Sequence, residues 1–147
     1  MFKKLIFLLI LVLLVTLTGC ASVPMAPTVD NQLRKQFLAP SKGKSGLYIF
    51  RDSSFGAALT KKISIDDQTI GATASKTFFY REITPGQHKL STQSEFGNND
   101  LSLKTNSGRN YFVRQYIKMG VFTGGANLEQ VSEEEGKKAV LDCNLAQ

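Results

Sequence analysis

Apolar and polar residues alternate in short runs along the chain from Gly46 onward. The runs are bounded by Gly, Asn, Asp and Pro, a pattern typical of β-strands joined by turns. Pro85 followed by Gly86 marks one such turn, because proline fixes φ and glycine permits a positive φ. Strands are therefore expected over residues 47–51, in a hairpin over 63–71, and over 76–83, 90–92, 101–103, 111–119 and 126–131.

A helix signal follows the last of these strands. Ser132 and Glu135 form a capping-box pattern, with acidic residues in the expected first turn and Lys137 and Lys138 further along. Gly136 lowers the helix propensity, so the pattern leaves the length of the helix open. About seven short strands and one terminal helix predict a mainly β domain. We expect an antiparallel β-sandwich, Ig-like or prealbumin-like, with the short C-terminal helix over an edge or one end.

The N-terminal residues follow a different pattern. Lys3 and Lys4 precede an unbroken apolar run of 11 residues, Leu5–Val15. A transmembrane helix needs about 20 apolar residues, so the run has the layout of a signal peptide instead. Residues 17–20 then read Leu-Thr-Gly-Cys. This tetrapeptide resembles the lipobox of bacterial lipoproteins.

The lipobox resemblance implies lipidation of Cys20 through a thioether, cleavage between Gly19 and Cys20, and acylation of the new α-amino group. The alternative is an ordinary secretory signal followed by a chance cysteine. Ala21 and Ser22 come next, so the aspartate that resembles the enterobacterial inner-membrane retention signal is absent. The expected location is the cell envelope and, in a Gram-negative organism, the outer-membrane leaflet that faces the periplasm.

Composition divides the chain into three parts. Residues 1–19 form the expected signal peptide, residues 20–45 the lipidated cysteine and a flexible tether, and residues 46–147 the β-sandwich domain. Proline and small polar residues dominate the tether, as in semi-rigid linkers. Within it, Leu33 and Phe37 have helical spacing, which indicates a short helix docked on the domain.

Charge and cysteine content limit the partners of the domain. Removal of residues 1–19 leaves 128 residues and lowers the formal net charge from +6 to +4, with the charges scattered along the chain. A nucleic-acid-binding protein has a denser basic patch, so no nucleic-acid partner is expected.

With Cys20 lipidated, Cys143 has no partner for an intramolecular disulfide. We expect a small buried hydrophobe there, with an intermolecular disulfide or a reactive thiol as the alternatives.

Few residues have the spacing of a catalytic or metal site. His88 is the sole histidine, and no Cys, His and carboxylate cluster has metal-ligand spacing, so neither a metal nor another cofactor is expected. Residues 43–45, Gly-Lys-Ser, lack the earlier glycine and the preceding strand of a phosphate loop. The acidic runs Asp66–Asp67 and Glu133–Glu135 fit a turn and a helix N-terminus. No catalytic residue is assigned.

Two loops carry apolar residues that packing alone does not require. Phe55 lies among small residues after the first strand, and Phe122 lies among glycines after the strand over 111–119. We favour the interpretation that the loops plug one end of the sandwich; the alternative is a contact surface for a partner or lipid. In the second case the two phenylalanines are the anchors, and Arg114 and Lys118 supply a polar rim.

Three motifs of the domain resemble a known family. They are the Tyr-Ile-Phe-Arg run 48–51 with Ser53–Gly56, the Pro-Gly-Gln-His turn 85–88, and the Tyr-Phe-Val-Arg run 111–114 followed by Met119, Gly120 and Phe122. Together with the lipobox, they resemble the bacterial lipoproteins grouped as domain of unknown function 2846, over about Gly46 to Cys143. The resemblance supplies no catalytic residues.

These observations favour a membrane-anchored envelope lipoprotein that acts as a non-enzymatic binding module for a protein, glycan or lipid partner. The alternative is an envelope hydrolase that acts on a glycan, peptide or lipid polymer. A convergent set of titratable groups would favour the hydrolase, and the sequence shows only scattered ones.

Overall fold

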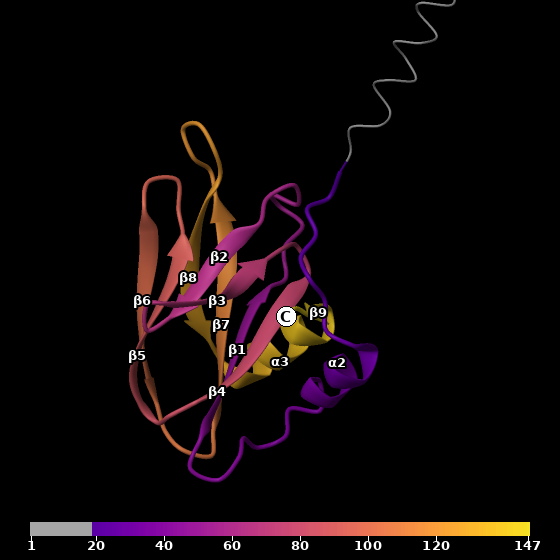
Figure 1. Ribbon diagram of the computed structural model, residues 1–147, viewed down its shortest axis with the longest axis vertical. Helices are drawn as coiled ribbons and strands as arrows, with labels where there is room; N and C mark the ends of the chain where they lie inside the picture. Colours follow the sequence, from indigo (N-terminus) through magenta and orange to yellow (C-terminus); the bar gives the residue numbers. More distant parts are fainter. Residues whose placement is uncertain (1–18) are drawn as a thin grey trace, which may run out of the picture.

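The computed structural model describes residues 19–147, so the predicted signal peptide up to residue 18 lies outside the described residues. The described chain forms two stacked β-sheets, with two helices beside one of them (Figure 1). The five-stranded sheet has the order β8-β7-β1-β4-β9, and the four-stranded sheet has the order β3-β2-β5-β6. The strands are β1 (Ser45–Arg51), β2 (Lys61–Ile65), β3 (Gln68–Thr73), β4 (Thr77–Ile83), β5 (Gly86–Gln93), β6 (Asn98–Thr105), β7 (Asn110–Lys118), β8 (Gly125–Val131) and β9 (Asn144–Leu145).

The prediction of a mainly β sandwich with a short C-terminal helix is confirmed, and two details differ. The described residues form nine strands rather than about seven, because the predicted hairpin over 63–71 holds two strands and β9 follows the helix. The sandwich is also not wholly antiparallel, since β1 runs parallel to β7 and β4 runs parallel to β9. Strands β5 and β6, which lie between β4 and β7 in the sequence, belong to the four-stranded sheet. The chain then returns to the five-stranded sheet, where β7 lies beside β1 and runs in the same direction.

Strand β1 lies between two hydrophobic cores and is buried on both faces. Leu47 and Ile49 belong to the core between the two sheets, whereas Tyr48 and Phe50 belong to the core under the helices. Each fully buried side chain of this size contributes about 1.5–3 kcal/mol relative to an exposed one. The other members of the first core are Ile63, Ile65, Leu90, Leu103, Val113 and Leu128, and those of the second are Phe78, Tyr80, Phe112, Ala139, Val140, Cys143 and Leu145.

Helix α3 (Glu133–Leu141) packs on the face of the five-stranded sheet over β7, not over an edge or an end as expected. The Ser132 side chain accepts a hydrogen bond from the Glu135 amide at 3.2 Å, which confirms the predicted N-cap. At Gly136, a Cβ atom would lie 2.3 Å from the Phe112 side chain. The glycine costs about 1 kcal/mol of helix propensity and permits the helix to approach the sheet this closely.

Part of the segment assigned to the tether packs on the sandwich. Helix α2 (Thr28–Arg34) matches the predicted short helix, and the Tyr48 hydroxyl donates a hydrogen bond to the Arg34 carbonyl at 2.9 Å. Phe37 follows the helix and packs against the Tyr48 ring, with 5.5 Å between the ring centroids. The Ala26 amide bonds to the Leu145 carbonyl at 2.9 Å. These contacts bind the chain to the domain well before β1 begins.

Candidate functional site

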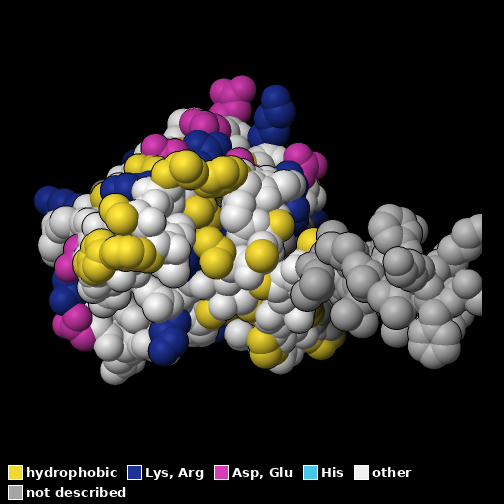
Figure 2. Space-filling model, turned by 90° about the horizontal axis from the view of Figure 1, so that it is seen from above, with side chains coloured by type: hydrophobic (Ala, Val, Ile, Leu, Met, Phe, Trp, Pro, Cys, Tyr) yellow, Lys and Arg dark blue, Asp and Glu magenta, His cyan; other side chains and the backbone are white. Residues whose placement is uncertain are grey.

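Five exposed apolar side chains gather at one end of the sandwich. They lie on the β1–β2 loop (residues 52–60), the β5–β6 loop (94–97) and the β7–β8 loop (119–124). Since β1 and β7 are parallel neighbours, the loops that follow them emerge at the same end (Figure 1). Figure 2 looks onto this end and shows hydrophobic side chains grouped on it, with charged ones mainly toward the margin. We call this group the loop platform; its members are Phe55, Phe96, Met119, Val121 and Phe122.

The β7–β8 loop is held by one carboxylate from the β5–β6 loop. Glu95 accepts hydrogen bonds from three successive backbone amides: Val121 at 2.7 Å, Phe122, and Thr123 at 3.0 Å. The bonds from Phe122 and Thr123 are the main reason that the pKa of Glu95 lies below its usual range. Gly120 permits the turn, because a Cβ atom there would lie 1.6 Å from the Thr123 carbonyl oxygen. The loop therefore has a defined shape although its side chains are exposed.

The β1–β2 loop is held by a buried guanidinium. Arg51 is 0% exposed, and it donates hydrogen bonds to the carbonyls of Leu59 at 2.7 Å, Phe55 at 3.2 Å and Gly56. Burial lowers the pKa of Arg51. Among residues 19–147 no carboxylate forms an ion pair with it, and its Nε atom has no hydrogen-bond partner. Its guanidinium thus organises backbone carbonyls of the loop that carries Phe55.

A hollow of about 270 Å³ separates the β1–β2 and β7–β8 loops. Its lining includes Phe55, Phe122 and Lys118, and Ile117 forms part of the floor. A Cβ atom at Gly124 would lie 3.1 Å from Ile117, so the second loop lies directly on this side chain. The hollow is mostly apolar and has an ammonium group at its margin.

The structure brings together three of the predicted contact residues. Phe55, Phe122 and Lys118 line the same hollow. The favoured interpretation, in which the two loops plug the sandwich, is wrong for these two side chains, because Phe55 is 55% exposed and Phe122 is 83% exposed. Packing of the two sheets is completed by residues of the strands instead.

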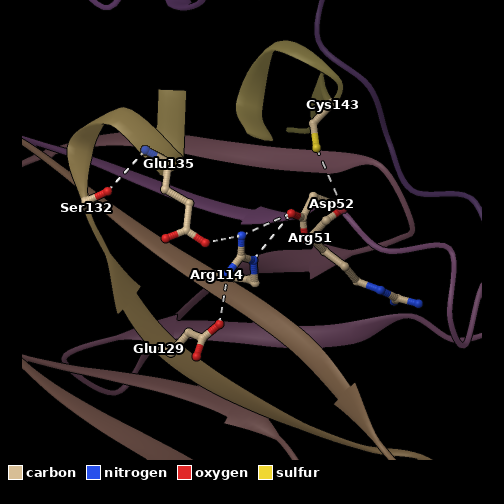
Figure 3. Close-up of polar contacts among 7 residues, drawn as sticks. All are labelled: Arg51, Asp52, Arg114, Glu129, Ser132, Glu135 and Cys143. Atoms are coloured by element: carbon tan, nitrogen blue, oxygen red, sulfur yellow. Dashed lines mark hydrogen bonds and ion pairs between the residues drawn. The ribbon is translucent and has the colours of Figure 1, made fainter. Parts of the chain in front are cut away.

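Arg114 does not belong to this surface, and its prediction as a polar rim is wrong. It lies under α3, where it forms ion pairs with Asp52 at 3.3 Å, Glu129 at 3.0 Å and Glu135 at 2.8 Å (Figure 3). Burial lowers its pKa, but the bonds to these carboxylates outweigh that effect and raise the pKa above its usual range. The alternation along β7 points Arg114 toward the helix layer, so the guanidinium joins α3 and β8 to the end of β1.

Cys143 lies in the same region and is fully buried (Figure 3). Its Sγ atom lies 3.7 Å from the Arg51 carbonyl oxygen. Burial raises the pKa of the thiol to about 12. The prediction of a small buried hydrophobe is confirmed, and a thiol in this position is neither ionised near neutral pH nor accessible to another chain.

Phe96, Glu95 and the role of Arg51 were not predicted from the sequence. Phe96 stands between a glutamate and a glycine in a short turn, which is the same signal that selects Phe55 and Phe122. The bonds of Glu95 and Arg51 connect loops in ways that depend on tertiary structure. Sequence alone offered no signal for them.

His88 pairs with a carboxylate in an open cavity of about 390 Å³. Its Nδ1–H donates to Asp66 at 2.7 Å, and its Nε2–H donates to the Thr84 carbonyl at 2.7 Å. Burial opposes the charge of the ring, but these two bonds outweigh it and raise the pKa of His88. Both nitrogens are therefore donors, and neither is free to act as a base. The imidazolium joins the β2–β3 turn to the β4–β5 turn.

Other features associated with metal binding or membrane crossing are absent from the described residues. Within residues 19–147, no three His, Cys, Asp or Glu side chains are grouped so that they could bind a metal ion. In the same part of the chain, no helix has the length and hydrophobicity needed to cross a bilayer.

Cys20 is exposed and lies close to the loop platform. The amide of Ala21, the next residue, donates a hydrogen bond to the carbonyl of Ala57 at 3.0 Å. Ala57 belongs to the β1–β2 loop, which also carries Phe55. The predicted lipidation site and the exposed apolar loops therefore share one end of the molecule (Figure 1).

Comparison with known proteins identifies the family of the chain. Residues 41–126 match the family described as "Protein of unknown function (DUF2846)". The chain belongs to this family. A relative from Haemophilus influenzae, described as "Uncharacterized protein", is 60% identical over 130 residues, which cover 88% of this chain and 77% of the relative. No solved structure matches the chain.

The DUF2846 match confirms the resemblance of the domain to this family, over residues 41–126 rather than up to Cys143. The matched segment runs from just before β1 to the first residues of β8. It contains all three platform loops, together with Arg51 and Glu95. Helix α3 and strand β9 follow it.

Truncation of the exposed phenylalanines should leave the fold stable. We expect Phe55→Ala and Phe122→Ala each to change the free energy of unfolding by about 0.5 kcal/mol or less, as for ordinary surface substitutions. Phe112→Ala is the matched control, because this ring is 1% exposed and its loss should cost about 3–5 kcal/mol. Urea titration of the purified chain measures all three. Losses at Phe55 and Phe122 comparable to that at Phe112 would show that the loops belong to the core.

The pH dependence of stability should depend on His88. Because its pKa is raised in the folded state, its contribution is complete below the unfolded value of about 6.5 and is lost as pH rises through the folded value. Unfolding free energy should therefore fall with rising pH in this range. His88 is the only histidine, so His88→Gln should flatten the curve. Urea titration at several pH values measures this dependence. Equal slopes of unfolding free energy against pH in the unaltered protein and in His88→Gln would refute the charged pair.

Proposed function

We propose that the chain is an envelope lipoprotein, anchored by lipid on Cys20, that acts as a non-enzymatic binding module through its loop platform. The observation that carries the proposal is the exposure of five apolar side chains on loops held in shape by Arg51 and Glu95. Contiguous exposed apolar groups are uncommon on monomeric proteins and mark contact sites. Loops that are already ordered lose little conformational entropy on binding, which favours affinity.

Anchoring is supported by the residues around Cys20. The Leu-Thr-Gly-Cys sequence over 17–20 follows a short apolar run, and Cys20 is exposed. Lipid on this residue would hold the protein in the cell envelope. With Ala21 and Ser22 after the cysteine, we propose the periplasmic leaflet of the outer membrane as its location in a Gram-negative organism.

A hydrolase receives less support from the geometry around His88. A general base needs a ring nitrogen that can accept a proton, and both nitrogens of His88 already donate hydrogen bonds. A nucleophilic hydroxyl would have to reach one of these nitrogens, and both positions are occupied by Asp66 and Thr84. The Asp66–His88 pair thus fits a structural role between two turns.

Photo-crosslinking in the living envelope tests the contact surface. We expect a benzophenone amino acid in place of Phe122 to form adducts with a protein, glycan or lipid of the envelope. The matched control is the same group in place of Leu38, which is 58% exposed and lies at the opposite end, where its carbonyl accepts a bond from Asn110 at the start of β7. Adducts no more abundant at Phe122 than at Leu38 would contradict the proposal.

The Cys20→Ala variant tests the anchoring in the same cells. This variant should incorporate no labelled fatty acid and remain as the uncut precursor, because the thiol that accepts the lipid is gone. If anchoring brings the platform to its partner, the benzophenone group in place of Phe122 should also form fewer adducts when Cys20→Ala is introduced. Labelled acyl chains on the variant would disprove lipidation at Cys20.

A further inference from the structure

We infer that the partner of the loop platform is the lipid bilayer that holds Cys20, with the loop tips inserted at the boundary between headgroups and acyl chains. This inference rests on the proposed function, since it assumes lipid on Cys20 and a contact role for the platform. It adds the chemical identity of the partner: a phospholipid surface rather than a protein or a glycan. Three observations support it.

The first observation is the short path from Cys20 to the platform. The Ala21 amide is bonded to Ala57, one of the β1–β2 loop residues, at 3.0 Å. The chain is fixed again at Pro24, whose carbonyl accepts a hydrogen bond from the Gln147 amide at 3.0 Å. An extended chain spans at most about 3.3–3.6 Å per residue, and Ala21 directly follows Cys20, so the connection to the Ala57 contact has almost no slack. Lipid on Cys20 therefore directs this end of the sandwich toward the membrane.

The second observation is that the backbone of the loop tips is internally hydrogen-bonded. Polar backbone groups cannot enter hydrocarbon without partners, because no water is there to replace their lost bonds. Glu95 satisfies the amides of residues 121–123, and Arg51 satisfies the carbonyls of Phe55, Gly56 and Leu59. The side chains that project from these loops are apolar and exposed, as Figure 2 shows for this end of the molecule.

The third observation is the charge at the margin of the platform. Lys118 is exposed and lines the hollow between the two loops. A lysine beside inserted apolar groups can bury its aliphatic stem and reach anionic headgroups with its ammonium. Without residues 1–19 the chain has a formal net charge of +4, which also favours an anionic lipid surface. A protein partner at this face would have to fit between the sandwich and the bilayer.

Tryptophan fluorescence tests the inference directly, because the chain contains no tryptophan. The full-length protein is expressed with its own N-terminus, purified as the lipidated form, and reconstituted in vesicles of phosphatidylethanolamine and phosphatidylglycerol. Phe122→Trp and Phe55→Trp place the probe on the platform, and Leu38→Trp is the control at the opposite end. Brominated acyl chains should quench the two platform probes roughly twofold or more, since interfacial apolar groups sit about 5–10 Å deep. The Leu38→Trp probe should remain unquenched.

The outcomes separate the inference from the proposed function. Quenching of both platform probes by brominated lipid, with a blue-shifted emission, supports insertion. Platform probes that respond to aqueous acrylamide but not to brominated lipid overturn the inference. If the group at Phe122 then still crosslinks to an envelope protein or glycan, the proposed contact surface stands and its partner is not the bilayer. If no adduct forms either, both proposals fail.

Discussion

The arrangement of the loop platform depends on one buried charge, the guanidinium of Arg51. It sits at the end of β1, a strand that is buried on both faces, and it bonds to carbonyls of the next loop rather than to a carboxylate. Burying a charge costs several kcal/mol unless its bonding groups are largely satisfied. The carbonyls of Phe55, Gly56 and Leu59 supply that compensation only in the loop conformation seen here. Because the strand is rigidly packed, the loop that carries Phe55 takes a fixed position.

The carboxylate of Glu95 orders the β7–β8 loop in a similar way. Glu95 binds three successive amides of the β7–β8 loop, so an anion organises donors there just as Arg51 organises acceptors in the β1–β2 loop. Both loops rest on Ile117, near the end of β7. Together these contacts explain how a protein can expose Phe55 and Phe122 without disordering the segments that carry them. A surface ordered in advance suits binding, because less entropy is lost on contact.

The local pattern of apolar, polar and capping residues was sufficient to predict much of the fold. The alternation along the chain located the long strands, and Ser132 with Glu135 located the start of α3. The pattern could not reveal β9, because it has only two residues and its pairing with β4 is a tertiary contact. Nor could it reveal the parallel pairing of β1 and β7, which depends on the path of the chain through both sheets.

The candidate site was predictable only in part, because it too depends on tertiary contacts that the local sequence pattern does not contain. Phe55 and Phe122 could be identified because an aromatic residue among small ones in a loop has no obvious core to join. Arg114 was misplaced, since alternation cannot distinguish a face covered by a helix from one open to solvent. Its three carboxylate partners come from the end of β1, from β8 and from α3. Glu95 and Arg51 form hydrogen bonds with backbone groups, and the pattern of side chains along the sequence does not predict such bonds.

The central claim is that the apolar loops are ordered before they meet a partner, and amide hydrogen exchange tests it most directly. Residue-resolved exchange in the purified chain should show the amides of Val121, Phe122 and Thr123 exchanging more slowly than in an unstructured peptide, although their side chains are exposed. Glu95→Ala should remove that protection and leave the amides within β7 and β8 unchanged. Exchange of the three amides at unstructured rates in the unaltered protein would contradict the account.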